Sequence, residues 1–189
     1  GEFPVVGVSW IQANQYAKWR TNRVNEALLV REGFLSENAK FVSLNGESPE
    51  FNSEAYLKNP SITYGGLIDS LQGKNKKDSI PVFAKASDGI ILPPYRLPTE
   101  TEWEYAARAN KKDNIFTWGN NINELHTNAN TWEGDFPITN SQKDGYERLA
   151  PVKTYPANDF GLYGMAGNVW EWTSDWFNVN YYSELSNTK

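Results

Sequence analysis

The sequence predicts one globular domain with little regular secondary structure, two clear helices and a core rich in aromatic side chains. Its 189 residues, 39% hydrophobic and 22% charged, are enough to bury a core and are too apolar for a disordered chain. Aromatic residues make up 14% of the chain, and each buried ring removes roughly 150 to 250 Å² from water. Such rings can anchor a fold in which turns outnumber long periodic segments.

Composition excludes several classes of function. The formal net charge is −5, and basic residues are scattered apart from "GKNKKD" at 73–78, so nucleic acid is an unfavourable partner. No run of 18 apolar residues and no basic-then-apolar leader pattern occurs. The abrupt start, "GEFPVVGVSW", predicts that a targeting segment lies upstream. With no cysteine in the chain, these residues supply neither disulfides nor thiolate metal ligands.

A first helix is predicted directly after "PVVGV". Ser9 and Gln12 fit a capping box, in which each side chain satisfies a free backbone N–H of the first turn. Three- and four-residue spacing then gives one partly apolar face that ends at about Leu29. The residues of this face are Ala13, Tyr16, Ala17, Arg20 and Val24.

Residues 31–94 are polar and punctuated by glycine and proline, with short helices expected at 53–57 and 66–71. We interpret this segment as an insertion on a single domain spanning 1–189. A linker between two domains is the alternative, but no second set of core elements follows it. The low apolar density predicts that the insertion adds little stability. Its basic loop (Lys74, Lys76 and Lys77) is expected to be mobile or bound to a partner.

A second helix is predicted from "RLPTETEWEYAARA". Thr99 and Glu102 form another capping box, and Glu104 precedes Arg108 by four residues, the favourable order for an ion pair. Trp103, Ala106 and Ala107 share the face expected to point inward. Glu100, Glu102 and Glu104 could be read as catalytic carboxylates, but capping explains them better, because paired catalytic acids need different environments.

The stretch "GLYGMAGNVWEWTSDW" at 161–176 concentrates tryptophan behind a run of glycines. A strand over "GNVWEWT" places Trp170 and Trp172 on one side, as a core layer, and Glu171 on the polar side. Stacking of a sugar on exposed tryptophan is the alternative, although clustered tryptophan is more often core. The glycines at 161, 164 and 167 are expected to supply positive φ angles or close backbone approach.

Several segments together resemble the formylglycine-generating enzymes, or sulfatase-modifying factors. They are "PVVGVSW", "RLPTETEWEYAARA", "FTWGN", "NANTWEGDFPITN", "DGY" and "APVKTYPANDFGLYGMAGNVWEWTSDWF", in this order. The resemblance implies an α+β fold related to C-type lectins, with a tryptophan-rich core. "PVVGVSWIQANQYAKWRTNRVNE" and the long insertion look most similar to the gliding-motility and type IX secretion lipoproteins of that family.

The resemblance also implies structural calcium. The family's first site corresponds to the side chains of Asn130 and Asp144 and the carbonyls of Thr131 and Tyr146. Without the resemblance, such an Asn-, Asp- and Gly-rich loop reads as a plain solvated turn. A second site would use the carbonyls of Gly167 and Val169 and the side chain of Glu171. That second site has one oxygen ligand fewer, because Gly164 stands where the family has an asparagine.

The catalytic chemistry of the family cannot be assigned to these residues. Formylglycine-generating enzymes oxidise a substrate cysteine through copper held by two cysteine thiolates that follow the "GNxWEW" segment, and this chain has no cysteine. No copper is therefore expected here. In related sulfoxide synthases the iron site is rich in histidine. The single histidine, His126, cannot build such a site and is read as a loop residue.

Three functions stay open at this point. The favoured one is a non-catalytic component of the gliding-motility or type IX secretion machinery that binds protein partners. It would be a lipoprotein at the periplasmic side of the outer membrane, held only by an upstream lipid anchor. The alternative is a piece of an active copper-dependent oxidase acting on sulfatases. A sugar- or peptide-binding module is the third reading, since fold alone cannot choose.

Overall fold

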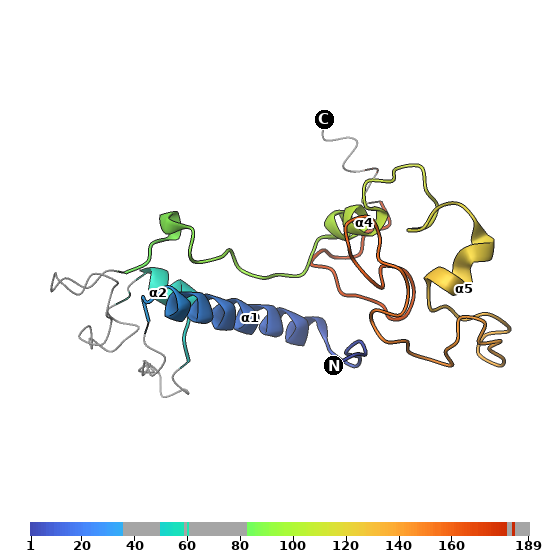
Figure 1. Ribbon diagram of the computed structural model, residues 1–189, viewed down its shortest axis with the longest axis horizontal. Coiled ribbons are helices and arrows are strands. Elements are labelled where there is room, and N and C mark those ends of the chain that lie inside the picture. Colours follow the sequence, from blue (N-terminus) through green and yellow to red (C-terminus); the bar gives the residue numbers. More distant parts are fainter. Residues whose placement is uncertain (36–49, 59, 61–82, 181–182, 184–189) are drawn as a thin grey trace. The chain divides into compact units, whose positions relative to one another are not determined.

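The computed structural model describes residues 1–35, 50–58, 60, 83–180 and 183 (Figure 1). In chain order the elements are α1 (Trp10–Arg31), α2 (Ser53–Lys58), η2 (Ala86–Asp88), α4 (Glu100–Arg108), η3 (Ile122–Glu124) and α5 (Leu125–Asn128). The expected scarcity of regular secondary structure is confirmed. Within the described ranges no strand forms, and Asn130 and Gly167 make an isolated parallel bridge. No described helix is both long and apolar enough to cross a membrane.

Backbone contacts divide the chain into two compact units. One unit comprises residues 1–10 and 97–189, and the other comprises residues 11–96. The second unit therefore contains most of α1 together with the segment interpreted above as an insertion. Each unit is described by itself below.

In the unit 11–96, α1 uses polar side chains to hold an extended segment of backbone. Asn25 accepts a hydrogen bond from the Leu92 N–H (2.9 Å) and donates one to the Leu92 carbonyl (3.2 Å). One turn earlier, the Thr21 hydroxyl accepts from the Tyr95 N–H (2.8 Å). These side chains satisfy backbone N–H and C=O groups of the extended segment, which in a β-sheet would pair with a neighbouring strand. The helix begins at Trp10, directly after Ser9, and ends two residues beyond the predicted Leu29.

Residues 31–94 contribute to a buried apolar cluster, although the segment has a low apolar density, and its small contribution to stability stays a prediction. Phe51 and Tyr56 are fully buried and pack with Leu29, Leu35 and Ala84 in one apolar cluster. Two aromatic rings bury enough area to support a core despite the low average hydrophobicity of the segment, and the Tyr56 hydroxyl also accepts the Ala84 N–H (3.0 Å). The expected short helix at 53–57 is confirmed as α2. The expected helix at 66–71 and the basic loop lie outside the described residues.

In the other unit, α4 begins as the sequence predicts. The Thr99 hydroxyl accepts the Glu102 N–H (3.2 Å), and the Glu102 carboxylate accepts the Thr99 N–H (2.8 Å). Glu104 and Arg108 pair at 2.7 Å. Both contacts are local, which explains why a capping signature and a four-residue charge spacing identified them.

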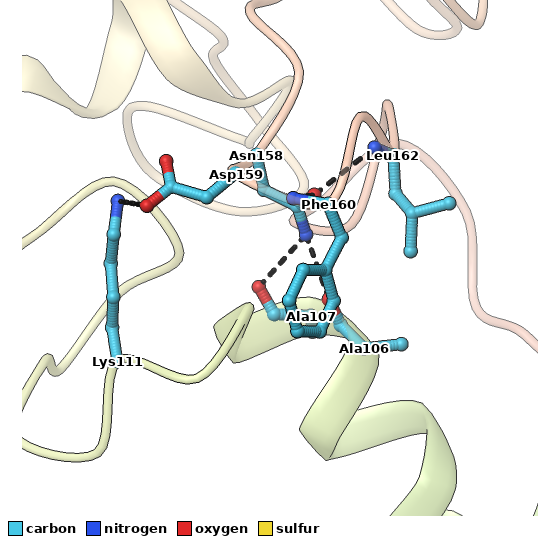
Figure 2. Close-up of polar contacts among 7 residues, drawn as sticks. All are labelled: Ala106, Ala107, Lys111, Asn158, Asp159, Phe160 and Leu162. Atoms are coloured by element: carbon cyan, nitrogen blue, oxygen red, sulfur yellow. Dashed lines mark hydrogen bonds and ion pairs between the residues drawn. The ribbon is translucent and has the colours of Figure 1, made fainter.

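The end of α4 is held by a distant loop (Figure 2). The Asn158 amide donates to the carbonyls of Ala106 (2.7 Å) and Ala107 (3.2 Å). Its oxygen accepts the N–H groups of Phe160 and Leu162, each at 3.0 Å. One side chain thereby satisfies two carbonyls near the helix end and closes its own turn.

Replacing Asn158 should therefore weaken the fold. We expect Asn158→Ala to lower the free energy of unfolding by about 1 to 3 kcal/mol, because helix carbonyls and turn N–H groups lose their partner. Urea unfolding followed by circular dichroism measures this change. Asn123→Ala, at an exposed position, is the matched control and should change stability by less than about 0.5 kcal/mol. Equal stability of both variants would show that this cap is dispensable.

Candidate functional site

Two asparagines, here called the asparagine pair, join three loops of the unit 1–10 and 97–189. The Asn168 oxygen accepts the Ala150 N–H (3.0 Å) and the Asn130 amide (3.2 Å). The Asn168 amide donates to the Ala150 carbonyl (3.1 Å), and the Asn130 amide also donates to the Arg148 carbonyl (2.8 Å). The Asn168 N–H donates to the Asn130 carbonyl (2.8 Å). The hydrogen bonds of these two side chains thus connect loops that form no β-sheet with one another.

Gly167 makes this arrangement possible. Its φ of +72° lies in the left-handed region, and a Cβ at this position would overlap the Asn130 carbonyl oxygen. Only glycine tolerates both conditions. The expectation of positive φ is confirmed for all three glycines, since Gly161 and Gly164 have φ of +76° and +66°.

The predicted strand at 167–173 is wrong. After Gly167, Asn168 is also left-handed (φ +66°), and the Val169 N–H turns back to the Gly167 carbonyl (2.9 Å). Two left-handed residues in succession cannot continue an extended strand. The hydrogen bonds of the asparagine pair outweigh the β propensity of the residues that follow.

The predicted tryptophan core does not form in the described residues either. Trp170 is fully exposed, Trp172 is 51% exposed and Trp176 is 92% exposed. Without a strand, Trp170 and Trp172 are not held on one face, although the Trp172 indole N–H donates to the Val8 carbonyl (3.0 Å). Trp170, Trp172 and Trp176 therefore lie at the surface rather than in a buried layer.

The residues of the first expected calcium site lie together. Asp144 is buried (8% exposed), and its two carboxylate oxygens accept the N–H groups of Thr131 and Tyr146, each at 3.0 Å. The Tyr155 hydroxyl donates to the Asp144 carbonyl (3.2 Å). Burial, assisted by the charge of Asp144, raises the pKa of Tyr155 to about 12. The phenol is thus a protonated donor at neutral pH and braces this loop.

The donor set fits a calcium ion. The Thr131 hydroxyl and one Glu133 carboxylate oxygen are buried without a hydrogen-bond partner, so the segment that carries Asn130 has unused oxygens. Asp144 forms no ion pair in the described part of the chain, and each of its oxygens keeps a lone pair. Oxygen donors of mixed type are what calcium prefers.

The residues of the second expected site line one cleft of about 610 Å³. Gly164, Gly167, Val169 and Glu171 all border it, together with Asn130 and Thr131 of the first site. The Glu171 carboxylate accepts the indole N–H of Trp103 (2.8 Å), which fixes its orientation. Gly164 brings no side-chain oxygen to the cleft. The two expected sites are therefore neighbours, and the second has fewer donors.

Other features of the site bear on its chemistry. His126 is exposed, as expected of a surface residue, and it lies on the short helix α5 rather than in a loop. Among the described residues, no group of three or more His, Cys, Asp or Glu side chains could hold a metal.

The roles of Asn158, Asn168 and Tyr155 were not predicted from the sequence. An asparagine beside glycines is a general turn signal, which does not reveal a distant partner.

Comparison with known proteins identifies relatives of this chain. A family model described as sulfatase-modifying factor enzyme 1-like domain matches residues 1–189. The chain is 48% identical over 90 residues to the formylglycine-generating enzyme of Bos taurus, covering 47% of this chain and 24% of that enzyme. The enzyme of Streptomyces coelicolor is 49% identical over 90 residues, covering 47% and 29%. The inactive C-alpha-formylglycine-generating enzyme 2 of Bos taurus is 48% identical over 80 residues, covering 42% and 25%. The chain thus spans between 24% and 29% of the length of these relatives.

The close approach at Gly167 can be tested with two glycines of similar φ. Gly161→Ala should lower the free energy of unfolding by about 1 kcal/mol, the cost of left-handed backbone at an open position. Gly167→Ala should lower it by at least about 3 kcal/mol, because a methyl group must also displace the Asn130 carbonyl. Urea unfolding of both variants gives the comparison. Equal losses would show that the close approach does not constrain the loops.

Proposed function

Because the chain belongs to the sulfatase-modifying factor family, we propose that it works as a non-catalytic scaffold whose loops are held by structural calcium. One contrast carries this proposal. The loops around Asp144 assemble an oxygen-donor set, whereas none of the 189 residues carries a thiol. The chain therefore contains oxygen ligands suited to a structural calcium ion, but it does not contain the thiolate ligands of the copper-dependent oxidase reaction.

Four residues would hold the ion. Asn130 and Asp144 would supply side-chain oxygens, and Thr131 and Tyr146 would supply carbonyls. Bound calcium would offset the buried charge of Asp144 and link the two loops. The chain itself positions these donors: the asparagine pair fixes Asn130, and the N–H groups of Thr131 and Tyr146 orient the carboxylate. Gly167, Val169 and Glu171 form the weaker second set.

The cellular setting is part of the proposal. The resemblance of "PVVGVSWIQANQYAKWRTNRVNE" and of the insertion to gliding-motility and type IX secretion lipoproteins supports a role in that machinery. The partners would then be proteins of a membrane-associated complex, and the location would be the periplasmic side of the outer membrane. Membrane contact would come through an upstream lipid anchor. Within the described part of this segment, Leu35, Phe51, Tyr56 and Ala84 pack in one apolar cluster, which would anchor a partner-binding loop to the fold.

A second candidate is part of an active formylglycine-generating oxidase. Its support is the 48% and 49% identity to proteins with that name. An inactive relative is 48% identical, so identity alone does not separate the two functions. The sequence of the full-length gene separates them: two cysteines shortly downstream favour the oxidase, and an N-terminal lipobox favours the scaffold.

Calcium should stabilise the folded chain. Since the ion binds only the assembled loops, calcium at 100 to 1,000 times its dissociation constant should raise the free energy of unfolding by about 2 to 4 kcal/mol. Thermal melts with EDTA and with a calcium series measure this gain. Asp144→Asn should remove most of it, and Glu171→Gln should remove less.

The control for this experiment is Asp135→Asn, which changes an exposed acid in the same loop and should keep the full calcium gain. Identical midpoints of the unaltered chain with EDTA and with calcium, after verified metal removal, would mean that the loop is a plain turn.

The chain should form no aldehyde on a cysteine-containing sulfatase peptide, with or without copper, because oxygen activation by copper(I) needs thiolates that it lacks. Mass spectrometry of the peptide after incubation measures the product, and an intact formylglycine-generating enzyme serves as the positive control. Aldehyde formed by this chain alone would refute the scaffold.

A further inference from the structure

We infer that Glu133 is a further calcium ligand of the proposed first site, and that the Thr131 hydroxyl supplies another oxygen to the same ion. Neither group belongs to the four donors named above, which are the side chains of Asn130 and Asp144 and the carbonyls of Thr131 and Tyr146. The inference rests on the proposed calcium-held scaffold and specifies which charges of the loops set the affinity for the ion.

Backbone hydrogen bonds place Glu133 beside the loop that carries Asp144. The Thr131 N–H donates to the Asp144 carboxylate (3.0 Å), and the Glu133 carbonyl accepts the Ser141 N–H (2.7 Å). The two segments therefore run side by side in opposite directions. The Glu133 carboxylate also lies 3.9 Å from the ammonium group of Lys143, the residue before Asp144. The side chain of Glu133 thus reaches the Asp144 loop.

The Glu133 carboxylate is mostly buried and poorly compensated. The side chain is 18% exposed, and its Oε1 atom is buried without a hydrogen-bond partner. Oε2 faces the Lys143 ammonium at 3.9 Å, which is too long for a hydrogen bond. Lys143 itself is 69% exposed, and ion pairs with such exposed lysines contribute little. A carboxylate held in this way costs free energy that a bound cation would offset.

The surroundings of Oε1 favour a bare metal ion over a larger cation. The atom is closed to solvent, so a lysine or arginine side chain of a partner would have to open the loop to reach it. A calcium ion lies only about 2.3 to 2.6 Å from its oxygen ligands, which is shorter than the roughly 2.8 Å of a hydrogen bond from water. The Thr131 hydroxyl in the same segment is also buried without a partner. One ion between the two loops would satisfy both oxygens.

These two oxygens complete the donor set of the proposed site. With them the loops offer two carboxylates, an amide oxygen, a hydroxyl and two carbonyls, which reaches the roughly six to eight oxygen ligands that calcium takes. Glu133 and Asp144 together balance the double charge of the ion. Because calcium affinity depends on the number of charged ligands, Glu133 should determine how tightly the ion holds the two loops.

The test is a calorimetric calcium titration of the full 189-residue chain after verified metal removal. Glu133→Gln keeps the shape of the side chain but removes its charge, and it should weaken calcium binding by at least about tenfold. Thr131→Val removes only the hydroxyl and should weaken binding by about threefold. Asp135→Asn is the matched control, because it neutralises an exposed acid in the same loop. It should change the dissociation constant by less than about twofold.

Thermal melts separate a metal ligand from a structural ion pair. Without calcium, Glu133→Gln should melt at or above the midpoint of the unaltered chain, because it removes a buried charge that lacks a close counter-ion. With calcium it should melt below the unaltered chain. Lys143→Gln should bind calcium at least as tightly as the unaltered chain, since it removes a competing cation. If Glu133 served only to pair with Lys143, both variants would lower the midpoint in EDTA and leave calcium affinity unchanged.

Equal calcium affinity of Glu133→Gln and the unaltered chain would overturn the inference, as would a loss of affinity in Asp135→Asn equal to that in Glu133→Gln. The failures of the two proposals are distinguishable. If the unaltered chain takes up no calcium, the proposed scaffold loses its structural metal, and the inference fails with it. If the unaltered chain binds calcium and Glu133→Gln binds it as tightly, the four expected donors hold the ion and the role of Glu133 alone is refuted.

Discussion

The hydrogen bonds between Asn130 and Asn168 determine the architecture of the unit that carries the candidate site. They connect three loops that have no ladder of strand hydrogen bonds between them, and they do so because Gly167 lets two backbones approach closely. Asn130 sits at the junction and is also an expected metal ligand. In the proposed calcium site, Asn130 would therefore couple the order of the loops to metal binding.

The loops around Asp144 show how such a junction creates a site. Two N–H groups orient the carboxylate, the asparagine pair orients the neighbouring amide, and two buried oxygens remain without partners. A polar group buried without a partner costs free energy, and the calcium ion that we propose would offset this cost. The second donor set borders the same cleft as Asn130 and Thr131. Glu171, the carboxylate of that second set, borders this cleft as well.

Local signals in the sequence predicted the helices well, because capping boxes and charge spacing act within a few residues. The start of α1, the capping box of Thr99 and the positive φ of Gly167 were all predictable. Contacts across long sequence separations were not. Nothing near Asn158 reveals that it caps a helix 51 residues away, and the strand at 167–173 fails because Asn168 bonds to Ala150. The site residues came from resemblance to a family, and only geometry showed that Thr131, Asp144 and Tyr146 lie together.

The central claim is that calcium joins the 130–131 and 144–146 loops, and amide hydrogen exchange tests it directly. The N–H groups of Thr131 and Tyr146 both donate to Asp144, so calcium on that carboxylate should slow their exchange by at least about tenfold. The Ala109 N–H, bonded within the α4 cap, should slow less and provides the internal reference. Unchanged exchange at Thr131 and Tyr146 in saturating calcium would contradict the account.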